Sequence, residues 1–232
     1  MIMDLDEQIT EILDIFPGSF LKKKAVMEVP MFPSANIQVD LRKYPKRPKI
    51  IIPKKFQKAF GDFEYFLPTY KKWNRNHPIQ ISQILKALQY GFETIAGKKV
   101  HFSEKILNDI CYMAKTAYPK EFFSLLRIVN GVLHEYVLAP GTEASGISAV
   151  FFPSRIRGDR TLIATCHSHP SPNNHPSQAD LNTFKKFFIN AIIGAPFSIN
   201  TLGVYNFKGE PIPFEVHLSP PLDFMEDEES FF

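Results

Sequence analysis

The hydrophobic positions of the chain follow two different periods. Apolar residues recur at helical spacing from Leu5 and again from Ile81, and these stretches stop at Pro17-Gly18 and at Gly97. Between them lie three short β-rich runs bounded by prolines, at residues 25–30, 36–41 and 49–53. This order predicts an α+β domain over residues 1–98.

A second set of elements follows the polar stretch at residues 97–99, where we place the domain boundary. Ser103 is a candidate N-cap for another amphipathic helix. Strands are expected at residues 122–129, 132–138, 147–152 and 162–166, then a helix from Ser177 to about Asn190, then strands near 202–207 and 214–218. The second predicted domain covers residues 99–232 and ends in an acidic tail.

Composition narrows the class of protein. The chain is 44% hydrophobic and 22% charged, which is typical of a globular protein and excludes disordered, collagenous and coiled-coil classes. No apolar run approaches the roughly 20 residues that cross a bilayer, and the acidic N-terminus does not resemble a signal peptide. The two cysteines, Cys111 and Cys166, are too few for a disulfide framework. We therefore expect a cytoplasmic protein without a membrane partner.

The basic charge belongs to the first half of the chain. The net charge is only +3, but the segment from Arg42 to Lys58 holds eight basic residues. We interpret this segment as a solvated strand face. A docking surface for an acidic partner, or for the acidic tail, and a nucleic-acid contact are the alternatives. Nucleic acid is not among the partners that we predict.

The stretch from Thr165 to Asp180, TCHSHPSPNNHPSQAD, carries the candidate chemistry. His167 and His169 end an apolar strand, and residues two apart on a strand share one face, so both imidazoles can point at one metal ion. Asp180 follows in the first turn of the predicted helix. Two histidines and one carboxylate are the three ligands of a catalytic zinc site, which leaves its fourth position open.

Hydrolysis at such a site also needs a base that takes a proton from water and delivers it to the leaving amine. Glu121, at the start of an apolar strand, is the candidate. Each residue also has an ordinary interpretation: two half-exposed histidines, an N-cap at Ser177 with its first-turn acid, and a solvated glutamate. Their joint occurrence favours a metal centre.

The joint pattern resembles the signature of the JAMM metalloproteases, or MPN+ domains. That signature is a glutamate on an early strand followed by H-x-H-x7-S-x-x-D, and every position is present here, over roughly residues 100–220. The resemblance implies an α/β MPN fold of the cytidine-deaminase-like type. It also implies one Zn²⁺ per chain, bound by His167, His169 and Asp180. Glu121 would be the general base and acid, and Ser177 would hydrogen-bond the oxyanion.

The same resemblance implies a function. JAMM enzymes typically cleave the isopeptide or peptide bond after the C-terminal glycine of ubiquitin or a ubiquitin-like protein, so such conjugates are the expected substrates. The alternatives are a zinc hydrolase that processes a sulfur-carrier protein or another small conjugate, and a catalytically silent MPN scaffold. An accessory subunit or a homodimer is compatible with the sequence. Two nearby residues are not assigned to the site: His175 is expected at the surface and Cys166 inside the strand.

The first domain has a resemblance of its own. A helix, a strand meander, the segment Tyr44-Pro45-Lys46-Arg47-Pro48 and a closing helix resemble the ubiquitin-conjugating-enzyme fold or its RWD relatives. Residues 1–110 contain no cysteine, so the catalytic residue of such enzymes is missing. This resemblance implies a non-catalytic domain that binds or positions a partner.

Overall fold

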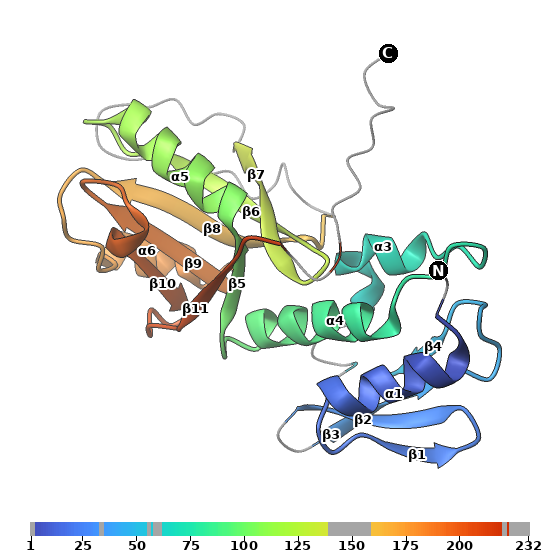
Figure 1. Cartoon of the computed structure of the whole chain (residues 1–232). Coiled ribbons are helices and arrows are strands. Elements are labelled where there is room, and N and C mark those ends of the chain that lie inside the picture. The colour runs from blue at the N-terminus through green and yellow to red at the C-terminus, as the bar shows by residue number, and fades with distance from the viewer. Residues whose placement is uncertain are drawn as a thin grey trace. The chain divides into compact units, whose positions relative to one another are not determined.

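The computed structural model of the chain describes residues 3–32, 35–54, 57, 62–138, 159–219 and 222. They belong to two compact units (Figure 1). The first unit comprises Met1–Gln89 together with Pro221–Phe232, and the second unit comprises Tyr90–Pro220. The strand predicted at residues 147–152 and the acidic C-terminal tail lie outside the described residues. Within the described part of the chain, no helix is both long and apolar enough to cross a membrane.

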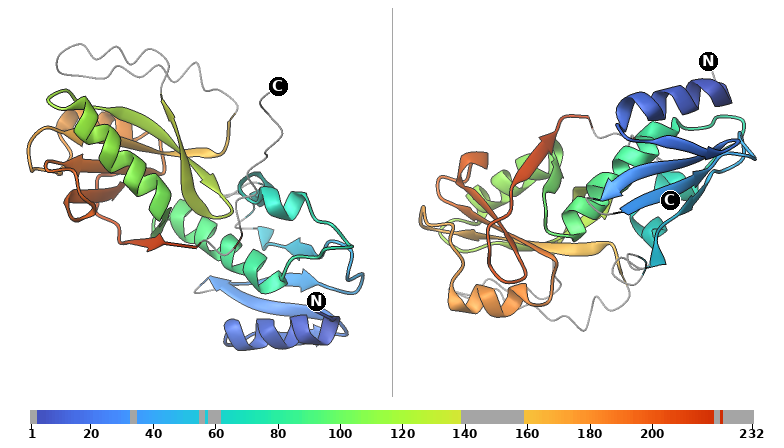
Figure 2. Two further views of the ribbon diagram at one scale, coloured as in Figure 1. Left: turned by 45° about the horizontal axis from the view of Figure 1, so that its top comes forward. Right: turned by 90° about the horizontal axis from the view of Figure 1, so that it is seen from below.

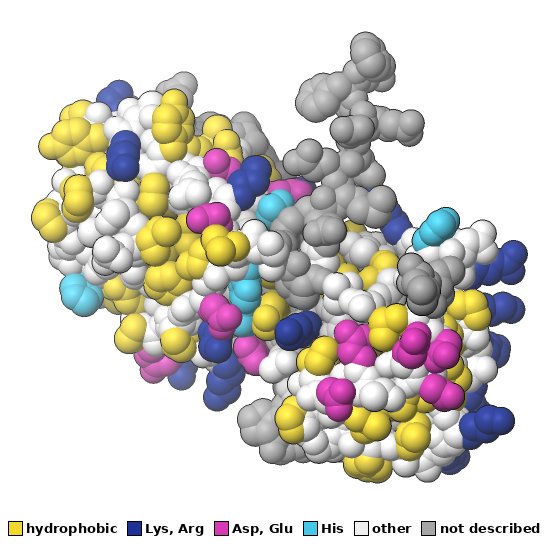
Figure 3. All heavy atoms as spheres, in the orientation of Figure 1, with side chains coloured by type: hydrophobic (Ala, Val, Ile, Leu, Met, Phe, Trp, Pro, Cys, Tyr) yellow, Lys and Arg dark blue, Asp and Glu magenta, His cyan; other side chains and the backbone are white. Residues whose placement is uncertain are grey.

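The first unit begins with the predicted amphipathic helix, α1 (Leu5–Ile15). Its start is fixed by a capping box, because Asp4 Oδ1 accepts a hydrogen bond from the Glu7 amide (2.9 Å) and Glu7 Oε2 accepts one from the Asp4 amide (2.7 Å). Ile9 and Ile12 form part of its buried stripe. In Figure 3 acidic side chains gather over this helix, and Lys and Arg side chains line the adjacent edge of the same unit.

An antiparallel meander follows, with its four strands paired in chain order. The strands are β1 (Phe20–Lys23), β2 (Val26–Phe32), β3 (Ala35–Asp40) and β4 (Lys49–Ile51). The three predicted strands are present, and β1 is an addition. The sequence of β1 ends in two lysines, and all four of its residues are exposed. It is therefore not one of the β-rich runs bounded by prolines that predicted the other strands. The conjugating-enzyme or RWD resemblance of this unit stays a prediction.

Beyond β4, the described residues include the helical segments η1 (Phe63–Phe66), α3 (Pro68–Lys71) and α4 (Ile81–Ile95). The long helix α4 is the predicted one, and its apolar stripe is buried. Gly97, with φ of +64°, supplies the left-handed conformation that ends it. The two compact units divide inside α4, between Gln89 and Tyr90, so this helix contributes to both. The predicted boundary near residue 98 stays a prediction.

The second unit is built on a seven-stranded sheet in the order β10-β9-β8-β6-β7-β5-β11. Parallel and antiparallel pairs are mixed, and helices pack on the sheet (Figure 2), which confirms the predicted α/β fold for this part of the chain. The elements are β5 (Val100–Ser103), α5 (Glu104–Ala117), β6 (Phe123–Val129), β7 (Val132–Leu138), β8 (Leu162–His169), α6 (Gln178–Phe184), β9 (Ile189–Gly194), η3 (Ile199–Thr201), β10 (Leu202–Asn206) and β11 (Phe214–His217).

One predicted element of this unit is wrong in its extent. The helix that starts at Ser177 ends at Phe184, and Asn190, its predicted last residue, lies in strand β9. The run Ile189–Gly194 is rich in β-branched residues and buried at every position, which is typical of a central strand covered on both faces. It pairs in parallel with β8, with Ile192 opposite His167. The strand β5 was also not predicted.

Candidate metal centre

Strand β8 carries both histidines at its C-terminal end. The strand runs through His169, so His167 and His169 share one face as predicted. Their Nε2 atoms lie 3.1 Å apart. His167 is 7% exposed, because β6 and β9 flank it in the sheet. The sheet, rather than a loop, therefore fixes the spacing of the two imidazoles.

Asp180 reaches the same point from the first turn of α6. Its Oδ1 lies 3.1 Å from His167 Nε2 and its Oδ2 lies 3.5 Å from His169 Nε2. The helix is also capped as expected: Ser177 Oγ accepts from the Asp180 amide (3.2 Å), and Asp180 Oδ2 accepts from the Ser177 amide (2.7 Å). The capping and the ligand interpretations are thus compatible, because one carboxylate serves both contacts.

The electrostatics of the group follow from this packing. Burial alone would raise the pKa of Asp180, but the hydrogen bonds from His167 and His169 outweigh it and hold the pKa well below its ordinary value. The hydrogen bond to Asp180 raises the pKa of His169, against the opposing effect of burial. The carboxylate is therefore ionised and available as a ligand across the ordinary pH range.

The backbone orients His169 for ligation. Its Nδ1 lies 2.8 Å from the carbonyl oxygen of Asn173, which can only accept, so Nδ1 carries the proton. In the neutral ring the lone pair is then on Nε2, the atom that faces His167 and Asp180. One donor atom from each of the three residues lies within 4.8 Å of the others. Two imidazoles and a carboxylate fit zinc and leave a coordination position open.

Glu121 precedes β6, the strand that pairs with β8. Phe123 lies opposite His167 in this antiparallel pair, and the same register carried two residues further sets Glu121 opposite His169. The pairing continues beyond the strand, because the Phe122 amide donates to Ser168 Oγ (2.9 Å) and the Ser168 amide donates to the Phe122 carbonyl (3.1 Å). Glu121 is half-buried, and its charge contributes to the raised pKa of His169.

The structure adds supporting residues that the sequence did not reveal. Ser168, buried between the two histidines, holds the segment that carries Glu121, and the Asn173 carbonyl orients His169. Neither contact belongs to a recognisable spacing in the sequence, so neither could be predicted from it. His175 and Cys166, which the sequence does not assign to the site, lie where they are predicted. His175 is exposed at the surface, and Cys166 is fully buried in strand β8.

Comparison with known proteins identifies this part of the chain. The family profile Prok-JAB, which describes prokaryotic homologues of the JAB domain, matches residues 103–204. A "probable metalloprotease" of Haloferax volcanii is 29% identical over 126 residues, which cover 50% of this chain and 75% of that protein.

Two solved structures are also similar. A JAB1/MPN domain protein from Archaeoglobus fulgidus is 32% identical, with 51% of this chain and 96% of that chain covered and a TM-score of 0.39. A protein described as having a metalloprotease-like zinc site of the JAMM type, in the proteasome and signalosome, is 30% identical, with 52% and 99% covered and a TM-score of 0.41. The profile match and the similarity to the probable metalloprotease show that the chain, through its residues 103–204, belongs to the JAMM/MPN family.

Proposed function

We propose that the protein is a zinc-dependent isopeptidase that cleaves the bond after the C-terminus of ubiquitin or a ubiquitin-like protein. One observation carries the proposal: His167, His169 and Asp180 converge on one point, and the pairing register sets Glu121 beside it. The probable metalloprotease and the metalloprotease-like zinc site among the similar proteins support it. The donor set supports zinc as the metal.

In this proposal Glu121 handles the protons. His167, His169 and Asp180 would hold a zinc ion, which would act as a Lewis acid toward the attacking water. Glu121 accepts a proton from the attacking water and later donates it to the leaving amine, so one carboxylate acts as base and then as acid. Its half-buried position supports this role, because partial burial limits competition from bulk water.

Ser177 is proposed to donate a hydrogen bond to the oxygen that becomes negative as water attacks the scissile carbonyl. Ser177 Oγ accepts from the Asp180 amide and thereby leaves its own O–H proton to another acceptor. Because Oγ is anchored within the capping box, the donor is already oriented before substrate arrives. Such preorganisation is what an oxyanion donor needs.

The first unit is proposed to bind or position a protein partner, such as the modifier or its carrier. Parts of the basic segment are already neutralised within the chain, since Arg42 pairs with Asp40 (2.6 Å) and Arg47 with Glu64 (3.4 Å). This pairing argues against a continuous phosphate-binding surface. An accessory subunit or a second copy of the chain remains part of the proposal.

Both cysteines are free thiols, which supports a reducing cytoplasm as the place of action.

Two other functions fit the same centre. A zinc hydrolase that processes a sulfur-carrier protein or another small conjugate would use the same three ligands together with Glu121 and Ser177. A catalytically silent MPN scaffold would not need the ligands, yet all of them are present and converge here. The convergence favours an enzyme over a scaffold.

The test compares zinc binding and cleavage in the full chain. Fusions that carry a peptide after the C-terminal glycine of ubiquitin, of a ubiquitin-like protein or of a sulfur-carrier protein serve as substrates. We expect Glu121→Gln to keep the zinc and lose cleavage, and His169→Ala to lose one zinc per chain and cleavage together. Glu104→Gln, an exposed change at the start of α5, is the matched control and should leave both intact.

The outcomes separate the candidate functions. Cleavage of the sulfur-carrier fusion alone would favour the second function. If the wild-type chain binds zinc and cleaves none of the fusions, the isopeptidase assignment is wrong. If His169→Ala binds as much zinc as the wild type, the metal-site assignment is wrong.

A further inference from the structure

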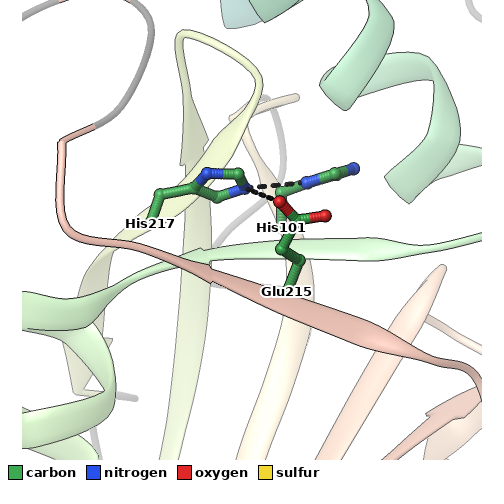
Figure 4. Close-up of side chains that lie close together, drawn as sticks. All are labelled: His101, Glu215 and His217. Carbon is green, nitrogen blue, oxygen red and sulfur yellow. Dashed lines mark hydrogen bonds and ion pairs between the residues drawn. The ribbon is translucent and has the colours of Figure 1, made fainter.

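A second histidine–carboxylate group lies at the other edge of the sheet of the second unit. His101 comes from β5, and Glu215 and His217 come from β11, the edge strand (Figure 4). The two strands run parallel with Glu215 opposite His101, and His217 follows two residues later, so all three side chains share one face. One donor atom from each residue lies within 4.8 Å of the others.

The geometry repeats that of the first centre. His101 Nδ1 lies 2.9 Å from His217 Nε2, compared with 3.1 Å between the imidazole nitrogens of His167 and His169. Glu215 Oε1 lies 4.0 Å from the same His217 nitrogen. Figure 4 shows both contacts meeting at that atom. Two imidazoles and a carboxylate thus converge here as they do on β8.

A carboxylate orients the buried histidine of this group. His101 is 1% exposed, and its Nε2 lies 2.8 Å from Glu93 Oε2 near the end of α4. With the proton on Nε2, the lone pair of the neutral ring is on Nδ1, which faces His217. Histidines that bind metals almost always donate their other ring N–H to such a partner. The backbone amide of His101 also donates to Thr94 Oγ1 (3.3 Å), which fixes the residue.

The contacts of Tyr90 and Lys99 with this group are compatible with metal binding by the three residues. The Tyr90 ring stacks on His101 at 4.0 Å and on His217 at 4.7 Å, so both imidazole planes are held from one side. Lys99 Nζ binds Glu215 Oε2 at 3.2 Å, while Oε1 is the oxygen nearer to His217. The side chain of Glu215 is 47% exposed, which gives an ion a path from solvent.

We propose that His101, Glu215 and His217 form a second zinc site, separate from the centre on β8. Two imidazoles and one carboxylate suit a divalent borderline cation such as Zn²⁺. Because its ligands come from both strands and His101 is anchored to α4, the ion fastens the short edge strand β11 to β5 and to the last turns of that helix. Its role is to stabilise this edge of the unit.

The first experiment measures zinc per chain by equilibrium dialysis and metal analysis on the full protein. We expect about two zinc ions in the wild type and one in His169→Ala. Glu215→Gln and His217→Asn, each alone, should also bind one, and His169→Ala combined with His217→Asn should bind none. His77→Asn, an exposed histidine of the first unit, is the matched control and should keep the wild-type value.

The results also separate this proposal from the proposed function. The second site is disproved if His169→Ala binds no zinc, or if Glu215→Gln and His217→Asn bind as much as the wild type. If the wild type binds one zinc that His217→Asn loses and His169→Ala keeps, the second site stands and the first fails.

A melting experiment provides an independent readout. Zinc should raise the melting temperature of His169→Ala and leave that of the double variant unchanged. Equal shifts in both would contradict the proposal. Because Glu215→Gln replaces a half-exposed side chain with one of the same shape, its metal-free melting temperature should match that of the wild type, and so a lost zinc ion reflects the ligand.

Discussion

At the scale of single residues, the hydroxyl group of Ser177 has a structural role and a proposed catalytic role. Its oxygen accepts from the Asp180 amide and so begins α6, and its proton is the proposed donor to the substrate oxygen. A substitution that removes the hydroxyl group therefore affects both folding and catalysis. The two effects can be separated, because threonine also caps helices and retains the hydroxyl group.

We predict that Ser177→Ala lowers the free energy of unfolding by about 1 kcal/mol, the usual effect of a lost N-cap. The same change should lower kcat by roughly 100-fold, the typical effect of removing one oxyanion donor. Ser177→Thr should retain most of both. Urea unfolding and steady-state cleavage measure the two quantities. An Ala variant that loses stability alone would leave Ser177 as a cap only.

Cys166 provides a second prediction at this scale. It is fully buried on β8, and burial raises the pKa of its thiol well above the ordinary value. The thiolate is the reactive form, so a raised pKa means less thiolate at any given pH. In a Cys111→Ser variant at pH 8, we expect the remaining thiol to react with Ellman's reagent only after denaturant is added. Rapid reaction of the folded protein would contradict this.

At the scale of elements, the loop between β8 and α6 sets the geometry of the candidate centre. Neighbouring segments hold it at several points: the Ala195 amide donates to the Ser171 carbonyl (3.0 Å), and Tyr205 Oη donates to the Asn174 carbonyl (2.9 Å). Gly194, the last residue of β9, lies against the same loop. A Cβ atom there would be 2.8 Å from the Pro172 carbonyl oxygen, closer than van der Waals contact allows.

We therefore predict that Gly194→Ala displaces this loop and with it the position of Asp180 relative to the histidines. A displacement of about 1 Å can lower kcat/KM by roughly 100-fold. Gly97→Ala is the control, because it strains the backbone at positive φ without meeting a close neighbour, and it should lower the melting temperature while cleavage persists. If Gly194→Ala cleaves at the wild-type rate, the loop does not determine the geometry of the site.

Elements with a strong local signal could be predicted from the sequence. The apolar stripe of α4, the cap at Ser103 and the H-x-H pair on a strand all rest on neighbouring residues, and the structure has each of them. The spacing of the motif also indicated His167, His169 and Asp180, and the structure brings donor atoms of these three residues within 4.8 Å of one another. The start of β9 is predicted as the end of a helix, because a short apolar run fits both structures and only its pairing with β8 decides between them.

The second histidine group illustrates what local patterns cannot predict. Its residues lie more than a hundred positions apart, and they meet only because β11, the last strand of the sheet, pairs with β5. The sequence predicts no strand at Val100–Ser103, where β5 lies. Without that strand, nothing places His101 beside Glu215 and His217.

At the scale of the whole molecule, α4 is shared between the two compact units. Its last turns carry Tyr90, Glu93 and Thr94, which contact His101 in the second unit. Phe92, 1% exposed, and Ile95, 7% exposed, also belong to this part of the helix. A cut at the predicted domain boundary would remove all of these contacts from the unit that holds the candidate centre.

We predict that a fragment of residues 99–232 is markedly less stable than one of residues 78–232, which keeps α4. Removal of a buried phenylalanine alone costs about 3–5 kcal/mol, which corresponds to a melting temperature lower by roughly 10 °C in a domain of this size. Thermal unfolding of the two fragments, both without metal, checks this. Equal melting temperatures would show that α4 is dispensable for the second unit.

The position of β11 has a consequence for how the second unit can be joined to other proteins. The first strand of this unit, β5, and its last strand, β11, are neighbours at one edge of the sheet, whereas the candidate centre is on β8, with β6 and β7 between it and β5. The chain therefore enters the sheet through β5 and leaves it through β11 at the same edge. A protein fused next to β5 or next to β11 would therefore be attached at this one edge of the sheet. The strand β8, which carries the candidate ligands His167 and His169, would stay away from both junctions.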